Sequence, residues 1–158
     1  MWGKNHVPRF SFIVGLVTRN AITTRDKQLQ WGRITQANCP LCDGGLETSD
    51  HLFFQCSYSA QIAACGIGLN WFNHCFWDAA LTAACSNNSS NTTAGRVRGI
   101  VWSLVIAHIW YERCRRCKGE PALTPAAVAQ RIYKEISFLV CGKPELEADF
   151  GEVKLLRV

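Results

Sequence analysis

Residues 39–56 read CPLCDGGLETSDHLFFQC, and in this segment three cysteines and one histidine follow the spacing C-x2-C-x8-H-x4-C. Thiolate and imidazole are ligands that suit zinc, and four of them complete a tetrahedral shell. A complete shell has no open position for a substrate, so the motif indicates a structural site and not a metal-catalysed reaction. We therefore predict one structural Zn²⁺ ion, and its ligands are Cys39, Cys42, His51 and Cys56.

The residues between these ligands favour the same interpretation. Pro40 restricts the backbone between the first two cysteines, and a turn at residues 43–45, Asp-Gly-Gly, sends the chain back. Nine cysteines in one chain produce some spacings by chance, and free cysteine is also a common small core residue. A CxxC pair followed at short range by a histidine and a further cysteine is much more specific than a CxxC pair alone.

The composition is typical of one intracellular domain or of two small domains in tandem. Of the 158 residues, 48% are apolar, which is enough to build a core. An odd number of cysteines cannot form a complete set of disulfides, which indicates a reducing compartment, nuclear or cytoplasmic. The apolar runs at 10–17 and 100–110 are too short to cross a bilayer, and no convincing cleavage site follows the first. We expect no membrane partner.

The chain has the pattern of a mainly α-helical protein. An apolar helix is expected over residues 9–19. A second helix is expected to start at Thr23, with Asp26 at the capping-box position and Gly32 as its stop. Both precede the zinc loop.

The zinc loop leads into another expected helix. Ser49 or Asp50 is predicted to cap it, and it is predicted to continue through Cys56, so that two ligands face the CxxC turn from one helix. One more short helix is expected within residues 71–85. Residues 1–85 are thus predicted to form a small zinc-knuckle module embedded between short helices.

A polar segment separates this module from a second helical unit. Residues 86–95 consist of Ser, Asn and Thr up to Ala94, a composition typical of a linker. Two helices are predicted to follow and to pack as an antiparallel hairpin over residues 96–142. In the first, apolar side chains and one histidine recur at helical spacing: Val97, Ile100, Val101, Leu104, Val105, His108 and Ile109.

The second helix of the hairpin has clear end signals. Thr124 is its expected N-cap, Pro125 its first residue, and Gly142 its stop. Its apolar stripe is Val128, Ile132, Ile136, Leu139 and Val140. The remaining residues, 143–158, form an acidic tail that is expected to be flexible.

Charge is distributed in blocks. Residues 1–36 carry six Lys or Arg and one acid, residues 37–95 carry four acids and no Lys or Arg, and residues 96–118 carry six bases and one acid. The net charge of +5 therefore comes from two basic blocks that flank an acidic finger. Such basic blocks can supply the phosphate contacts of a nucleic-acid-binding protein.

If the partner is RNA or DNA, the basic flanks and not the finger are expected to contact phosphates. The candidate residues are Arg9, Arg19, Arg25, Lys27, Arg33, Arg113, Arg115, Arg116 and Lys118. Trp31 or Tyr111 could stack on unpaired bases, and the finger would act as a clamp between the helices on either side of it. The alternative is that these charges are solvated at helix ends, where bases also suit the helix dipole.

Four segments together resemble a known family: VPRFSFIVGLVTRN at 7–20, TTRDKQLQWG at 23–32, CPLCDGGLETSDHLFFQCSYS at 39–59 and IWYERCRR at 109–116. They are similar to the zinc-binding domain of plant reverse transcriptases, which lies near the C-terminal end of the polyprotein of LINE-type non-LTR retrotransposons. The resemblance is specific over residues 7–62. It implies zinc at the four ligands named above and a role in handling template RNA or target DNA.

The chain also departs from that family. Gly15 stands at a position where a large aromatic residue is usual, Ala63 and Ala64 where a tryptophan is common, and Cys114 and Cys117 interrupt a basic run. A polymerase motif of the Y-x-D-D kind is absent, so we expect a non-catalytic protein and no enzyme.

Three interpretations of function follow from the sequence. The first is a zinc-binding module that binds RNA or DNA without sequence specificity. The second is a zinc-stabilised protein-interaction or dimerisation module, in which the apolar faces of the hairpin meet a partner or a second copy. The third is a retroelement remnant without function.

Two further cysteine patterns contain residue types that could form a site. Cys114 and Cys117 form a CxxC beside arginines, but late in a helix, whereas a redox CxxC opens a helix after a strand. Residues 65–85 contain Cys65, His74, Cys75 and Cys85 as a second set of ligand types. His108, on an apolar face, is expected to be a satisfied core histidine.

Overall fold

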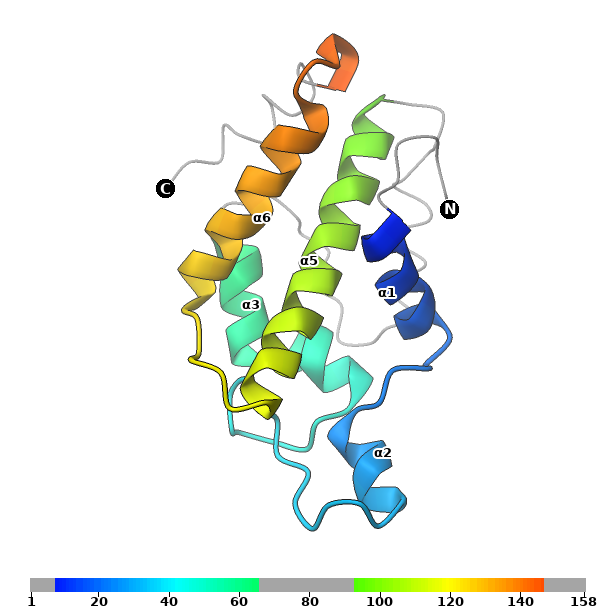
Figure 1. The fold of residues 1–158 in the computed structure, drawn as a ribbon, viewed down its shortest axis with the longest axis vertical. Helices are drawn as coiled ribbons and strands as arrows, with labels where there is room; N and C mark the ends of the chain where they lie inside the picture. Colours follow the sequence, from blue (N-terminus) through cyan, green and yellow to red (C-terminus); the bar gives the residue numbers. More distant parts are fainter. Residues whose placement is uncertain (1–7, 66–92, 147–158) are drawn as a thin grey trace.

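The computed structural model describes residues 8–65 and 93–146, and Figure 1 shows their arrangement. These residues are mainly helical, and within them the only β-type pairing is an isolated bridge between Asn38 and Leu46. The elements are α1 (Pro8–Thr18), α2 (Arg25–Gln30), η1 (His51–Gln55), α3 (Ser57–Ala64), α5 (Thr93–Cys117) and α6 (Pro125–Val140). The predicted fold class, mainly α with a metal-binding loop between short helices, is confirmed.

The long helix α5 and helix α6 run antiparallel and pack against each other (Figure 1). Residues of both predicted apolar stripes lie in the core: Leu104, Ile109 and Ile132 are completely buried and belong to one cluster of apolar side chains. Thr124 caps α6 as expected: its Oγ1 accepts a hydrogen bond from the N–H of Ala127 at 3.2 Å.

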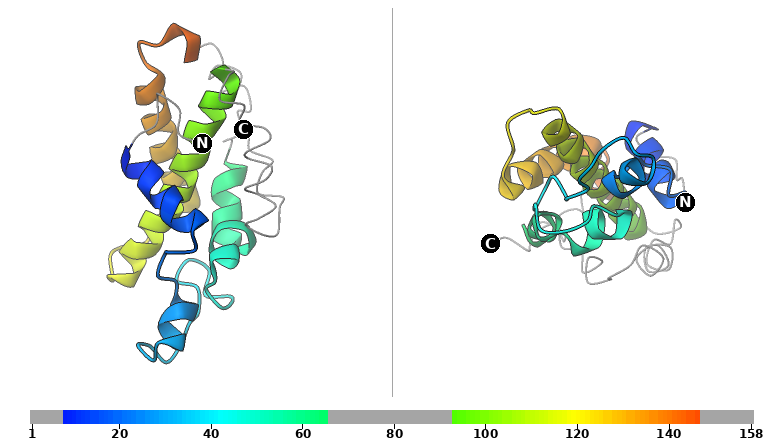
Figure 2. Two further views of the ribbon diagram at one scale, coloured as in Figure 1. Left: turned by 90° about the vertical axis from the view of Figure 1, so that its right-hand side faces the viewer. Right: turned by 90° about the horizontal axis from the view of Figure 1, so that it is seen from below.

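Helices α1 and α3 complete the core around α5 (Figures 1 and 2). Helix α1 packs on α5, and α3 packs on α6 and on α5. Phe10 and Val17 of α1, Ile62 of α3 and Ile136 of α6 all belong to one cluster of buried apolar side chains. Burial of apolar side chains is the main stabilising term of folding. The metal loop and the helical hairpin therefore share one hydrophobic core.

The start of α2 differs from the prediction by one residue. Thr24 is the N-cap, and its hydroxyl donates a hydrogen bond to the carboxylate of Asp26. Thr23 lies before the helix, with its carbonyl bound by Arg113 Nη2 at 3.2 Å. The predicted stop is confirmed: Gly32 has a φ of +67°, a conformation that glycine adopts without strain.

The predicted linker ends earlier than expected. Helix α5 begins at Thr93, so residues 93–95 are helical. The predicted apolar stripe of this helix starts only at Val97. A helix can nevertheless extend into the sequence before its stripe, because propagation adds one hydrogen bond per residue. The segment 86–92 lies outside the described residues, as do the helix predicted within 71–85 and the second ligand set that depends on it.

The end of α6 is followed by a turn at Gly142, which has a φ of +76° as its predicted role requires. Leu146, in the first part of the predicted flexible tail, is completely buried in the core. Residues 147–158 lie outside the described residues. Over residues 8–65 and 93–146, the structure contains no helix that is both long and apolar enough to cross a membrane.

Candidate metal centre

The loop after α2 brings the first two ligands into place. Cys39 follows the bridge between Asn38 and Leu46, and its N–H donates to the carbonyl of Gly45 at 2.7 Å. The N–H of Asp43 donates back to the carbonyl of Cys39 at 2.8 Å, which closes a tight turn. Asp43 has a φ of +53°, a conformation that aspartate tolerates better than most residues. The predicted knuckle turn is therefore present.

The other two ligands come from the ends of η1. His51 is its first residue, and Thr48 caps this turn: its Oγ1 accepts the N–H of His51 at 3.0 Å. The sequence indicates Ser49 or Asp50 as the cap. Asp50 does directly precede η1, but its side chain makes no capping hydrogen bond, and Thr48 supplies it instead. The continuous helix that was predicted is also wrong, because Cys56 has an extended backbone (φ −73°, ψ 126°) between η1 and α3.

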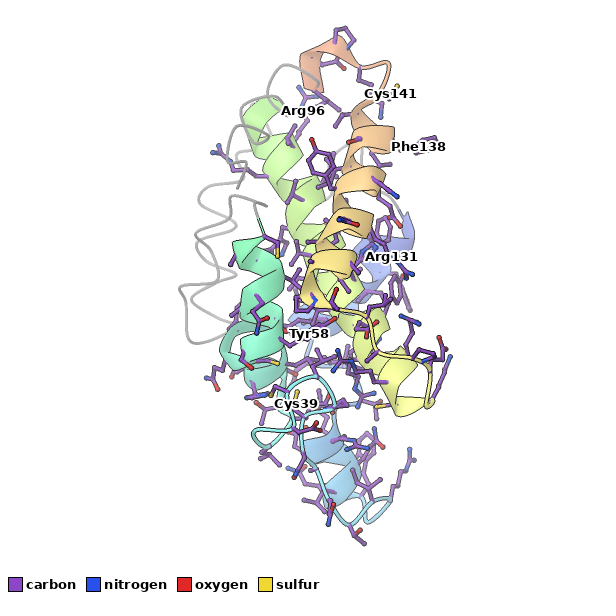
Figure 3. The ribbon with its side chains drawn as sticks, turned by 90° about the vertical axis from the view of Figure 1, so that its left-hand side faces the viewer. Cys39, Tyr58, Arg96, Arg131, Phe138 and Cys141 are labelled. Atoms are coloured by element: carbon purple, nitrogen blue, oxygen red, sulfur yellow. The ribbon has the colours of Figure 1, made fainter. Side chains whose placement is uncertain are left out.

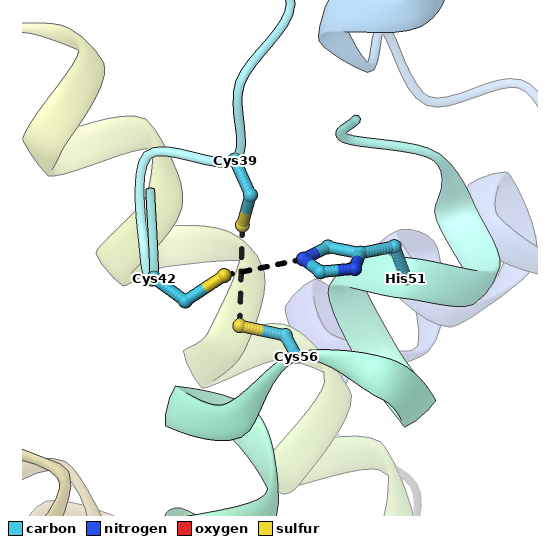
Figure 4. Close-up of side chains that lie close together, drawn as sticks. All are labelled: Cys39, Cys42, His51 and Cys56. Carbon is cyan, nitrogen blue, oxygen red and sulfur yellow. Dashed lines mark hydrogen bonds between the residues drawn. The ribbon is translucent and has the colours of Figure 1, made fainter. Parts of the chain in front are cut away.

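The break at Cys56 has a clear effect on the site. An extended residue between two helical segments turns the Cys56 side chain toward the knuckle and lets α3 leave in a new direction, as Figure 4 shows. Ser59 supports the break, since its hydroxyl donates to the carbonyl of Leu52 at 2.6 Å. The N–H of Cys56 donates to the carbonyl of His51 at 2.7 Å, which ties the last ligand to the third.

The four predicted ligands converge on one point. Their ligand atoms all lie within 4.8 Å of one another. Cys39 Sγ and Cys56 Sγ are 3.9 Å apart, and Cys42 Sγ and His51 Nε2 are 3.3 Å apart (Figure 4). Tetrahedral zinc with ordinary bond lengths would place two sulfurs ~3.8 Å apart and a sulfur and a nitrogen ~3.5 Å apart.

The chemistry of the donor set also fits a cation. Cys39 and Cys56 are completely buried, and Cys42 and His51 are partly buried. The hydrogen bond between the two buried sulfurs raises the pKa of Cys39, as does burial, and the same bond lowers the pKa of Cys56 to about 5. Without a cation, one thiol keeps its proton and donates to the other sulfur. A zinc ion held by these four residues would stabilise all three cysteines as thiolates and would cross-link the loop to η1 and α3.

Two arginines of α5 connect this loop to the rest of the fold. Arg113 donates to the Glu47 carboxylate from Nε at 2.6 Å and from Nη2 at 2.9 Å. Arg116 donates from Nη1 to the carbonyls of Pro40 and Leu41 at 3.2 and 2.9 Å. Sequence reasoning placed both arginines at a nucleic-acid surface. It missed their role here because the partners lie 66 and about 75 residues away in the chain.

The contact with Glu47 keeps Arg113 charged although the Arg113 side chain is buried. Burial alone would lower the pKa of Arg113, but the hydrogen bond and the charge of Glu47 more than offset this and raise it. Arg113 therefore keeps its charge inside the protein. Arg113 is therefore not favoured as a phosphate contact, because its side chain is only 7% exposed and its Nε and Nη2 atoms donate to groups within the fold.

The remaining basic candidates fall into three groups. Arg25, Lys27, Arg115 and Arg116 are partly buried and donate hydrogen bonds to groups of the chain. Arg19, Arg33 and Lys118 are exposed. The side chain of Arg9 lies outside the described residues.

The other residues singled out in the sequence are accounted for as follows. His108 is buried, with Nδ1 3.0 Å from the carbonyl of Leu104 and Nε2 3.5 Å from Glu135 Oε1, as expected for a satisfied core histidine. Cys114 is partly buried, and burial raises the pKa of its thiol. A raised pKa disfavours the reactive thiolate, which argues further against a redox role for Cys114.

Comparison with known proteins agrees with the geometry. Residues 1–62 match the model of a family described as zinc-binding in reverse transcriptase. This region contains all four ligands, so its resemblance to a reverse transcriptase zinc-binding domain is confirmed. The matched family is a zinc-binding region and not the catalytic part of the enzyme. No curated protein and no solved structure matches the chain.

Proposed function

We propose that this chain is a non-catalytic, zinc-stabilised module that binds RNA or DNA and derives from the reverse transcriptase of a LINE-type retrotransposon of plants. The observation that carries the proposal is the convergence of four zinc-type ligands within 4.8 Å in the region similar to a reverse transcriptase zinc-binding domain. Such a module acts in the nucleus or the cytoplasm, where its thiols stay reduced.

The proposed contact surface is the exposed end of α2. None of the residues of this helix is buried. Trp31 follows it directly with 54% of its side chain exposed, and the turn at Gly32 places the Arg33 guanidinium 4.9 Å from the Trp31 ring centroid. An exposed aromatic ring can stack on an unpaired base, and an adjacent guanidinium can bind phosphate or stack with it.

Further positive charge lies at the same end of the molecule. Helices α1 and α5 both end toward α2 and the metal loop (Figure 1). Arg19 follows α1 and Lys118 follows α5, and both side chains are exposed. Arg19, Arg33 and Lys118 therefore replace the longer set of nine as the favoured phosphate contacts. Binding through such contacts is sequence-independent and steeply dependent on salt.

The test is a titration of labelled single-stranded and double-stranded RNA and DNA with the zinc-loaded protein, followed by fluorescence anisotropy at several salt concentrations. We expect Arg33→Ala to weaken binding and to reduce the slope of log K against log salt by about one. Trp31→Ala should weaken binding to single strands more than to duplexes. Arg131→Ala removes another exposed charge, from α6, and serves as the control (Figure 3).

Two results would contradict the proposal. One is an affinity that does not change between low and moderate salt. The other is an equal loss of affinity in Arg33→Ala and Arg131→Ala, since that would indicate a response to net charge and not to a defined surface.

A protein-interaction module is the second candidate function. The surface that would meet its partner differs from the one predicted from the sequence. The apolar faces of α5 and α6 are buried within the chain and are not available to a partner. Exposed aromatic side chains are found instead at Phe12 and Phe138, which are 65% and 82% exposed, and Phe138 points away from α6 (Figure 3). Sedimentation at several concentrations distinguishes the two candidates: a stable dimer without affinity for RNA or DNA would favour interaction.

A further inference from the structure

The geometry points to Arg116 as a positioning residue of the metal centre: its guanidinium holds the two peptide units whose N–H groups donate to the Cys39 sulfur. It does not touch the ligands themselves. It acts on them through the backbone of the knuckle, and this makes it part of the zinc site although it lies 60 residues beyond the last ligand in the sequence.

The first step is the pairing of donors and acceptors in the knuckle. The turn that the Asp43 N–H closes onto the Cys39 carbonyl at 2.8 Å places the backbone N–H groups of Leu41 and Cys42 next to the Cys39 sulfur, where they can donate to it. Each N–H belongs to a peptide unit whose carbonyl is that of the preceding residue. The carbonyl partners of these two N–H groups are therefore those of Pro40 and Leu41.

Arg116 binds these same two carbonyls. Its Nη1 donates to Pro40 O at 3.2 Å and to Leu41 O at 2.9 Å. A hydrogen bond to a carbonyl polarises its peptide unit and makes the N–H at the other end a stronger donor. Because the donor is a cation, the effect is larger than for a neutral group. Arg116 therefore both aligns and strengthens the two N–H donors that face Cys39.

The guanidinium is itself held in place. Glu112 Oε1 accepts a bond from Arg116 Nε at 3.0 Å, and the carbonyl of Leu123 accepts one from Nη2 at 3.1 Å. On one face, the Tyr58 ring lies with its centroid 4.4 Å from the Arg116 Cζ atom. A side chain fixed on so many sides can hold the knuckle carbonyls in one position.

The contact with Tyr58 extends the arrangement to a second ligand. The backbone N–H of Tyr58 is one of the groups that donate to the Cys56 thiol. The Tyr58 hydroxyl donates to Leu123 O at 2.7 Å, the carbonyl that Arg116 also binds. One guanidinium thus supports the backbone donors of both buried cysteines. Groups that orient metal ligands in this way typically change metal affinity roughly tenfold to hundredfold when they are removed.

The experiment compares Arg116→Met with Arg115→Met in the full chain. Arg115 is the matched control, because it pairs with the same Glu112, through Oε2 at 2.9 Å. Its other partners among the described residues are Glu120 and the carbonyl of Pro121, which lie outside the knuckle. Zinc affinity is measured by competition with a chelator. The same proteins are loaded with Co²⁺, and the sulfur-to-cobalt charge-transfer band is recorded, because its energy reports how strongly the thiolates are hydrogen-bonded.

We expect Arg116→Met to bind zinc roughly tenfold to hundredfold more weakly and to shift the cobalt band to lower energy, since a thiolate with weaker hydrogen bonds donates charge more readily. Arg115→Met should do neither. An unchanged affinity in Arg116→Met, an equal loss in Arg115→Met, or a loss without a band shift would each overturn the inference. If Arg116→Met does not fold, Arg116→Lys decides: it keeps the charge and loses the planar fork. A band shift in Arg116→Lys supports the inference, and an unshifted band overturns it.

Discussion

Arg113 of α5 and Glu47 of the metal loop form a buried, two-bond ion pair, with the side chains 7% and 0% exposed. The same carboxylate accepts the backbone N–H of Arg25 at 2.8 Å, and Arg113 Nη2 also donates to the carbonyl of Thr23 at 3.2 Å. The pair therefore joins three segments: the start of α2, the metal loop and the end of α5. Both this ion pair and apolar packing hold helix α5 against the first half of the chain.

Breaking this pair on one side is expected to destabilise the protein strongly. In Glu47→Gln, Arg113 stays buried without a counter-ion, and leaving one buried charge unpaired costs about 3–5 kcal/mol of the free energy of unfolding. The measurement is urea unfolding of the zinc-loaded protein, followed by circular dichroism.

The matched control is Glu120→Gln. Glu120 pairs with Arg115 at 2.8 Å, but its side chain is 44% exposed. Exposed pairs contribute about 1 kcal/mol or less, so this substitution should have a small effect. If both variants lost a similar amount of the free energy of unfolding, the buried Glu47–Arg113 pair would contribute no more to stability than the exposed pair.

The metal prediction concerns stoichiometry. Elemental analysis of the purified protein should give one zinc per chain, and Cys42→Ser should lose it together with helical signal when compared with the wild type. Cys65→Ser is the control, because Cys65 is an exposed free cysteine outside the cluster. Retention of zinc in Cys42→Ser, or its loss in Cys65→Ser, would argue against the four-ligand site.

The cap of η1 gives a smaller, local prediction. Thr48→Ala removes the acceptor of the His51 N–H and should lower the free energy of unfolding by about 1 kcal/mol. Ser49→Ala tests the cap that the sequence had suggested. Since the Ser49 hydroxyl makes an exposed bond to Asn20 Oδ1 at 3.2 Å, this variant should be nearly as stable as the wild type. A larger loss in Ser49→Ala than in Thr48→Ala would contradict the assignment.

Acidification is expected to release the metal. Without zinc, the hydrogen bond with Cys56 raises the pKa of Cys39, so at neutral pH Cys39 keeps a proton that zinc must displace. Lower pH favours the protonated ligands, and zinc affinity should therefore fall as the pH falls. Chelator competition from about pH 8 to about pH 5.5 measures this dependence. An affinity that stays constant over this range would show that no ligand proton is displaced.

Much of the helical architecture could be predicted because its signals are local. The cap at Thr124, the stops at Gly32 and Gly142, and the stripe that contains Ile132 each depend on residues a few positions apart. The errors were also local: the caps at Thr24 and Thr48 differ from the predicted residues by one or two positions. Neighbouring Ser, Thr and Asp residues are nearly equivalent as caps, and tertiary contacts select among them.

Arginines of the two basic blocks lie in different environments in the fold. The sequence shows that Arg113 and Arg33 are both in basic blocks, and composition treats them alike. In the fold, Arg113 is buried against Glu47, whereas Arg33 is exposed over Trp31. Only the position of each side chain relative to distant segments separates a structural arginine from a surface one.

The sequence by itself determined the metal centre, since Cys39, Cys42, His51 and Cys56 lie within 18 residues and ligand type and spacing are enough to define a tetrahedral set. It also determined the helical class through apolar periodicity. The tertiary structure decided how α5 is joined to the metal loop, because Glu47 and Arg113 are 66 residues apart and no periodicity links them. Contacts of that range form only when a shared core brings the segments together, and here the core of α1, α3, α5 and α6 does so.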